Sequence, residues 1–259
     1  MIKRIAQLIL FLLLILISFL IYLSIYGIST NKFNNLISEK IIERDKNLNI
    51  NFNKIKIFLN INNRNFELKT SNPKVSFKNK EIKIKSISTD LPIRNFFSKK
   101  INLEEVKIIT GKNKLQNLIN ILRSHKNNPQ LFILNKIVKN GYVSLESKIT
   151  FNEDGSIKNN YLIDGNIEDL QIKLLNNKVI ENTSLSFLIR EKDYLIYNLS
   201  SIYQSIKIRS NQVKIVSTKN YYAFEGDIAN QKSEIDINDI SIFLNNSIKS
   251  MFNEKLTVS

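Results

Sequence analysis

An unbroken apolar run from Ile5 to Ile28 limits most strongly how this chain can fold. It contains no charged residue, and as an α-helix it would reach roughly 36 Å, enough to cross a hydrocarbon core of about 30 Å. Lys3 and Arg4 precede the run and only Lys32 follows it closely, so the positive-inside bias predicts a cytoplasmic N-terminus. The alternative is a cleaved signal peptide, whose apolar core is normally about 7 to 15 residues long and ends at a small-residue site. Ser24-Ile25-Tyr26-Gly27 is a poor cleavage site, so we favour an uncleaved anchor.

This interpretation divides the chain into three parts. Residues 1–28 form the cytoplasmic N-terminus and the transmembrane anchor, residues 29–46 a juxtamembrane amphipathic helix, and residues 47–259 a β-rich domain beyond the membrane. The helix is predicted from Thr30 to Arg44, where Phe33, Leu36 and Ile37 follow a three-to-four spacing. It could lie on the membrane surface or cover the open end of the β domain. We favour the cover, because a β domain that starts here needs its end protected.

From Leu48 the apolar residues alternate with polar ones, which predicts β-strands. A phase change at Ile87 indicates a bulge, and Pro92 indicates an edge or a bend. Helical spacing returns near 113–124 and again near 238–253. The chain then ends at Ser259, and we expect either a short protein with a helical cap or the front part of a longer one.

The tract from Leu131 to Phe224 is predicted to be an antiparallel meander, with hairpin turns at Asn140-Gly141 and at Glu153-Asp154-Gly155-Ser156. Separate strands are expected around Val143 to Phe151, Ile163 and Ile167, Ile172 and Leu174, Leu185 to Ile189, Ile206 and Ile208, and Val213 and Ile215. The predicted fold class is mainly β with a few helices. An N-terminal transmembrane helix is followed by a curled antiparallel β-sheet groove with short flanking helices.

The composition argues against a reaction centre. With no cysteine and one histidine, thiolate metal sites, Cys–His pairs and multi-histidine sites are excluded or nearly so. His125 falls in a polar segment that predicts an exposed loop, and Asp154-Gly155 and Asp164-Gly165 are typical of turns or bulges. No phosphate-binding glycine pattern is present. We therefore predict a protein that is not an enzyme and that has no catalytic residue, no metal and no cofactor.

The formal net charge of +15 points to anionic partners, such as lipid headgroups, an acidic envelope polymer or nucleic acid. The lysines alternate with isoleucine, as in Lys54-Ile55-Lys56-Ile57, which is typical of the solvent face of amphipathic strands. We expect no nucleic-acid binding outside the cytoplasm. The aliphatic face of such a sheet must be buried, curled on itself or offered to an apolar ligand. A curled groove and an ordinary closed β core both remain open on these grounds.

The order of motifs resembles the AsmA-like family of bacterial envelope proteins, which includes the YhdP and TamB branches. The apolar anchor and the helix after it come first. The family's first hairpin resembles LKTSNPKVSF (Leu68–Phe77), and its strand with a Leu-Pro-Ile step resembles IKIKSISTDLPIRNFF (Ile82–Phe97). Its next strand resembles INLEEVKII (Ile101–Ile109). Its groove repeat resembles EDGSIKNNYLIDGNIEDLQIKLLNN (Glu153–Asn177), and the strand after that resembles NTSLSFLI (Asn182–Ile189). Most family members are far longer, so we expect a truncated, split or short version.

The resemblance implies a non-enzymatic protein of the bacterial inner membrane, with a single span and most of the chain in the periplasm. It would shield or carry phospholipid acyl chains in a hydrophobic β-groove, for envelope lipid transport or outer-membrane homeostasis. The alternatives are an envelope scaffold that binds a protein partner through its β domain, or a lipopolysaccharide-export component of the LptC type. The candidate groove residues are Ile55, Ile57, Leu59, Ile61, Ile82, Ile84, Val143, Leu145, Ile149, Phe151, Ile163, Ile167, Ile172, Leu174, Leu185, Phe187 and Ile189.

Overall fold

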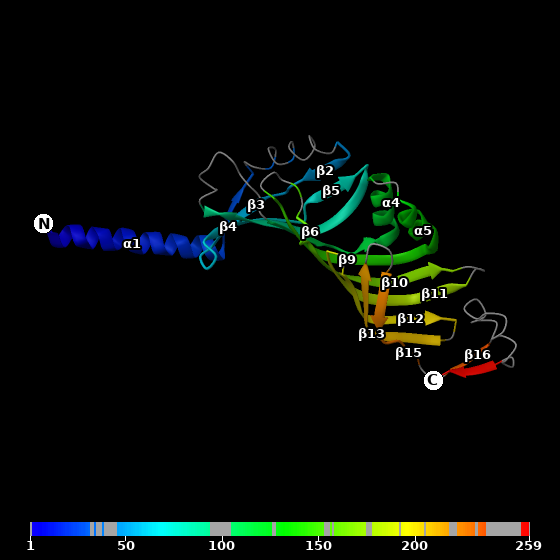
Figure 1. Ribbon diagram of the computed structural model, residues 1–259. Coiled ribbons are helices and arrows are strands. Elements are labelled where there is room, and N and C mark those ends of the chain that lie inside the picture. The colour runs from blue at the N-terminus through cyan, green and yellow to red at the C-terminus, as the bar shows by residue number, and fades with distance from the viewer. Residues whose placement is uncertain are drawn as a thin grey trace. The chain divides into compact units, whose positions relative to one another are not determined.

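The computed structural model contains one large antiparallel sheet that follows an N-terminal helix (Figure 1). It describes residues 2–31, 34, 38, 46–93, 105–125, 128–152, 156, 158–174, 178–191, 193–204, 206–217, 222–230, 233–236 and 255–258. Three helices lie within these ranges: α1 (Ile2–Ile25), α4 (Leu115–His125) and α5 (Pro129–Ile137). The predicted fold class, mainly β with a few helices, is confirmed.

The hydrogen-bonded strand order in the sheet is β1-β3-β4-β6-β7-β9-β10-β11-β12-β13-β14. Among the described strands no pairing joins β1 to β14, so the sheet is not closed. The chain divides into two compact units, Met1–Thr110 with Ser147–Tyr161, and Gly111–Glu146 with Leu162–Ser259. Each unit is described separately below.

Helix α1 is long and apolar enough to cross a membrane, and its side chains are almost all exposed. It ends at Ile25, three residues before the predicted end of the anchor. Strand β1 (Ile28–Thr30) follows and pairs with β3 (Ile55–Asn60), so the predicted helix start at Thr30 is wrong. A strand forms there because its backbone groups find partners along β3.

Most of the predicted 30–44 helix lies outside the described residues, as do the predicted helical segment near 238–253 and the segment around Phe96. Beyond Asn31, two positions of the first segment are described. The Asn34 side-chain amide donates to the Phe52 carbonyl oxygen at 2.9 Å, and the Ser38 hydroxyl donates to the Ile50 carbonyl oxygen at 3.0 Å. At these two points the segment therefore lies beside β2 and the residue that follows it, and its role as a cover stays a prediction.

The remaining strands of the first unit are short, apart from β6. They are β2 (Leu48–Asn51), β4 (Asn65–Ser71), β5 (Lys74–Phe77), β6 (Lys80–Pro92) and β7 (Glu105–Thr110). The first part of β6 pairs with β5 and the later part pairs with β4, so β6 connects two small groups of strands. A register shift between Ile84 and Ser86 confirms the predicted bulge in this strand.

The second unit contains α4, α5 and most of the long strands. These are β8 (Asn113–Lys114), β9 (Val138–Thr150, which reaches into the first unit), β10 (Leu162–Lys173), β11 (Val179–Arg190), β12 (Asp193–Tyr203), β13 (Ile206–Ser217), β14 (Tyr222–Gly226) and β15 (Ala229–Asn230). Two further short strands, β16 (Ser233–Asp236) and β17 (Lys255–Val258), pair with each other. The helix predicted near 113–124 is confirmed as α4.

Three predictions for this unit are wrong. The segment from Leu131 begins as helix, because Asn128 accepts a hydrogen bond from the Gln130 amide at 2.8 Å and Pro129 suits the first helical position. Asn140-Gly141 lies inside β9 and makes no turn. A Cβ on Gly141 would lie 3.2 Å from Leu170, so this glycine permits close packing. One strand was expected to end after Ile167 and another after Ile208, each followed by a separate strand. The structure has one continuous strand at each place, β10 and β13.

Candidate functional site

The registers of strands β10 to β14 bring a set of uncharged residues onto one face of the sheet. Directly paired residues of antiparallel strands point to the same side, and so do residues two apart in one strand. One row consists of Ile163, Ile189, Tyr194, Ile215 and Phe224. The row beside it consists of Gly165, Phe187, Ile196, Val213 and Gly226. We call these two rows the open apolar face.

The side chains of the open apolar face are accessible to solvent. Ile163, Ile189, Tyr194 and Ile215 are only partly buried, and Phe224 is 70% exposed. With about 4.8 Å between neighbouring strands, five strands give a surface roughly 19 Å across. An uncharged surface of this extent that is accessible to water is typical of a binding site for another apolar partner.

Gly165 shapes the middle of this face. A Cβ on Gly165 would lie 2.5 Å from Phe187 Cζ and 3.0 Å from the Ser144 carbonyl oxygen. The Phe187 ring therefore lies across the glycine backbone of the neighbouring strand. A larger residue at position 165 would push the ring away, so this glycine makes the apolar surface continuous across β10 and β11.

The same face is covered farther along the strands. Ile119 of α4, Val138 and Leu170 form a buried cluster, against which Ile167 and Ile172 pack. A second cluster contains Tyr203 and Ile206, with Leu174, Ile180 and Ile208 packed against it. The hydroxyls of Thr183 and Ser201, buried between neighbouring strands, share a hydrogen bond of 2.8 Å. The sheet is thus a closed core at this end and an open surface at the other.

The opposite face of the open end carries charged as well as apolar residues. Tyr197 donates a hydrogen bond of 3.0 Å to Asp164, and the row that includes Asp164 continues through Leu188 and Leu195 to Lys214 and Glu225. Partial burial raises the pKa of the Tyr197 phenol above its usual value, and the hydrogen bond to Asp164 raises this pKa further. The two faces of these strands therefore differ in charge: the open apolar face has no charged residue, whereas the opposite face carries Asp164, Lys214 and Glu225, which disfavour contact with an apolar partner.

The structure brings only some of the sequence-predicted groove residues together. Ile163, Phe187 and Ile189 belong to the open apolar face. Ile167 and Leu185 form the pair next to this face. Ile167 also packs into the covered end of the sheet, together with Ile172 and Leu174. The open apolar face therefore takes three of its members from the predicted set in this unit.

The predicted groove residues of β3, β6 and β9 have other surroundings. Ile55, Leu59 and Val143 are buried, so a ligand would reach them only if their cover moved. The partly buried residues of this group are Ile57, Ile82, Ile84, Leu145, Ile149 and Phe151. Ile61 was predicted to continue the β3 alternation, and this is wrong. The strand ends at Asn60, and Ile61 lies in the following turn with 55% of its surface exposed.

Strand β12 supplies Tyr194 and Ile196 to the centre of the open apolar face and was not predicted from the sequence. The segment Tyr194-Leu195-Ile196-Tyr197 is a continuous apolar run without the alternation that marks a strand with one wet face. The signal available was the β-branched and aromatic content of the run, bounded by Asp193 and by Ser200-Ser201.

Comparisons with known proteins add no relative. The chain matches no family model, no curated protein sequence and no solved structure among those compared. Within the described ranges, no three His, Asp or Glu side chains lie together in a way that could hold a metal ion. The argument for function therefore depends on the open apolar face and on the apolar helix α1.

Proposed function

We propose that this chain is a single-pass protein of the bacterial inner membrane that shields phospholipid acyl chains on its open apolar face, in the manner of AsmA-like proteins. Helix α1 anchors it with the N-terminus in the cytoplasm, and the β domain lies in the periplasm. Its role would be lipid transport across the envelope or maintenance of the outer membrane. The observation that carries the proposal is the pair of adjacent, uncharged and partly exposed rows across β10 to β14.

The energetic argument is the transfer of apolar surface from water. Each CH₂ group that moves from water onto an apolar surface contributes about 0.8 kcal/mol. The two rows offer aliphatic and aromatic side chains with no charge that would have to lose its hydration. Acyl chains can lie along this face while the headgroup stays in water. No covalent step is needed.

A matched pair of neighbouring substitutions tests the proposal. Ile196 lies on the open apolar face, whereas Leu195 points to the opposite side, where it pairs with Lys214. Ile196→Asp should greatly reduce the amount of lipid bound per chain, and Leu195→Asp should leave it near the wild-type amount. The measurement is mass spectrometry of organic extracts from the full chain purified in neutral detergent. Lipid held around α1 is common to all three proteins and cancels in the comparison.

Equal lipid content in the two variants would contradict the proposal. The identity of the extracted lipid tests the proposed cargo. Phospholipid is expected, whereas a lipopolysaccharide would assign the chain to the export components considered above. Retention of the native circular dichroism spectrum by both variants shows that the comparison concerns binding.

A second candidate function is an envelope scaffold that binds a protein partner through the edge of its sheet. Strand β14 is at the end of the strand order, and Phe224 and Ile228 beside that edge are 70% and 75% exposed. An edge strand with exposed apolar side chains can accept a strand from another chain. Ile228→Asp should then abolish crosslinking to the partner and leave the bound lipid unchanged.

A further inference from the structure

A row of cationic side chains crosses the polar face of the first unit. Lys56 of β3 lies directly opposite Lys69 of β4. The same row continues to Ser29 of β1 on one side and to Ser88 and Lys107 on the other. Like charges directly opposite each other on neighbouring strands destabilise the pairing. A bound anion between Lys56 and Lys69 would reduce this repulsion.

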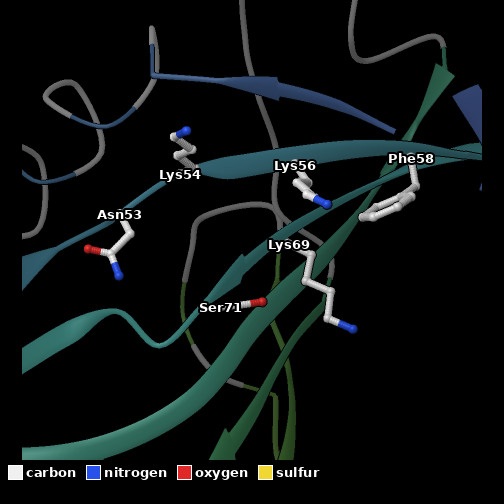
Figure 2. Close-up of a pocket in the computed structure, with 6 residues that line it drawn as sticks. All are labelled: Asn53, Lys54, Lys56, Phe58, Lys69 and Ser71. Carbon is white, nitrogen blue, oxygen red and sulfur yellow. The ribbon is translucent and has the colours of Figure 1, made fainter. Parts of the chain in front are cut away.

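The surface between these lysines is hollowed, with a volume of about 570 Å³. Figure 2 shows the six residues that line it: Asn53, Lys54, Lys56, Phe58, Lys69 and Ser71. Among the described residues, no carboxylate lies within 4 Å of the ammonium groups of Lys54, Lys56 or Lys69. Glu67 and Asp90 belong to the next row on the same face, opposite Phe58. The hollow thus concentrates positive charge beside one aromatic ring.

This hollow lies next to the end of the apolar helix. Ser29, which pairs with Lys56, comes four residues after the last residue of α1, so it lies at most roughly 14 Å from the helix end at about 3.4 Å per residue. A Cβ on Gly27 would lie 2.9 Å from Phe58 Cδ1, so the wall of the hollow touches the residues that leave the helix. The rings of Tyr22 and Tyr26 stack near that end with centroids 5.3 Å apart, as expected for aromatic residues at a membrane interface.

We propose that this lysine hollow binds the phosphate of an anionic phospholipid headgroup in the membrane that α1 crosses. The phosphate would lie between Lys56 and Lys69 and relieve their mutual repulsion. Lys54 adds charge, and the Ser71 hydroxyl adds a neutral donor. Phe58 and the lysine stems provide an apolar wall for the glycerol part of the lipid. The inference depends on α1 as a membrane anchor and is independent of the open apolar face, which belongs to the other unit.

The test is a titration of the full chain, in neutral detergent, with fluorescent short-chain phosphatidylglycerol. Lys56→Gln combined with Lys69→Gln should weaken binding roughly 10- to 30-fold, because each lysine near an anionic lipid surface contributes about 1 kcal/mol. The matched control is Lys74→Gln with Lys83→Gln, a second pair of directly opposed lysines in the same unit but outside the hollow. This control should stay within about threefold of the wild type.

Two further arms identify the ligand. Lys56→Arg combined with Lys69→Arg keeps the charge and should keep the affinity. Phosphatidylcholine, which has no net charge, should bind the wild-type chain more weakly than phosphatidylglycerol. The proposal is overturned if both glutamine pairs lose affinity equally, if phosphatidylcholine binds as well as phosphatidylglycerol, or if millimolar inorganic phosphate displaces the lipid completely. If the glutamine variant fails to fold, the wild-type measurements with phosphatidylcholine and with inorganic phosphate still test the proposal.

Discussion

The apolar faces of the two units are built from the same kind of sequence but are covered to different degrees. In the first unit, Ile55, Thr70 and Leu91 lie on the inner face of β3, β4 and β6, and all three are buried. In the second unit, Ile163 and Ile189 lie on an equally apolar face and remain partly exposed. Alternating aliphatic residues therefore specify a sheet with one apolar face, and the elements that pack against that face decide whether it becomes a core or a surface.

The difference follows from where the covering elements are. In the first unit Phe52, Val75 and Phe77 are buried as well, and β6 joins the group that contains β5 to the group that contains β4. In the second unit α4 reaches Leu170 and its neighbours at one end of the strands. Beyond that point the described side chains of the open apolar face remain partly or fully exposed, although the backbone of Gly165 is buried under the Phe187 ring.

The largest expected effect is the loss of stability when a buried residue of the covered face in the first unit is truncated. Leu91 is 2% exposed, so Leu91→Ala should lower the free energy of unfolding by about 2–5 kcal/mol through lost burial and a cavity. Ile196→Ala on the open apolar face should lower it by only about 1 kcal/mol, because that side chain is partly solvated already. Denaturant unfolding of the full chain in neutral detergent measures both. Equal losses would mean that the two faces are covered alike.

An intermediate effect is expected at Gly165. Gly165→Ala places a methyl group against the Phe187 ring and should lower the free energy of unfolding by about 1–3 kcal/mol while reducing lipid binding. Phe187→Leu in the same chain removes the clash and should restore most of the stability. The unfolding curves of the single and double variants provide the measurement. A double variant no more stable than Gly165→Ala alone would show that the ring does not lie over the glycine.

The smallest effect concerns the polar face behind the open end. Because the pKa of Tyr197 is raised by burial and by Asp164, the folded state favours the protonated phenol. The resulting stability is fully present below the ordinary tyrosine pKa of about 10 and is lost as the pH rises through the raised value. Tyr197→Phe should therefore flatten the fall in melting temperature between about pH 9 and 11. Asp164→Asn should lower the pKa of Tyr197, and an unchanged pH profile in both variants would contradict this assignment.

Part of this architecture could be predicted from the sequence. The alternation through Ile55 and Leu59 predicted β3, and the helical spacing from Leu115 predicted α4. In both segments the period of the apolar residues is enough to distinguish a strand from a helix. Strand β12 and helix α5 could not be assigned in this way. Tyr194 to Tyr197 and Leu131 to Leu134 are both short apolar runs, and tertiary packing and the Asn128 cap decide between strand and helix.

The membership of the open apolar face was harder to predict than the strands. Asp169, Asn182 and Asn198 have positive φ angles of 53°, 49° and 54°. These residues lie at or beside the register shifts of β10, β11 and β12. Each shift changes which side chains share a face, and Asn or Asp in this conformation is common in loops as well as in bulges. Ile163 and Ile189 were predicted as groove residues, whereas the contribution of Ile196 depends on a register that the sequence does not reveal.

The most direct test of the lipid-binding surface is photo-crosslinking from adjacent positions on opposite faces. A benzophenone amino acid replaces either Ile189, on the open apolar face, or Leu188, which points to the other side, in the full chain expressed in bacterial cells. The proposed function predicts adducts with phospholipid acyl chains from position 189 and few or none from position 188. Equal lipid adducts from both positions, or protein adducts alone from position 189, would contradict it.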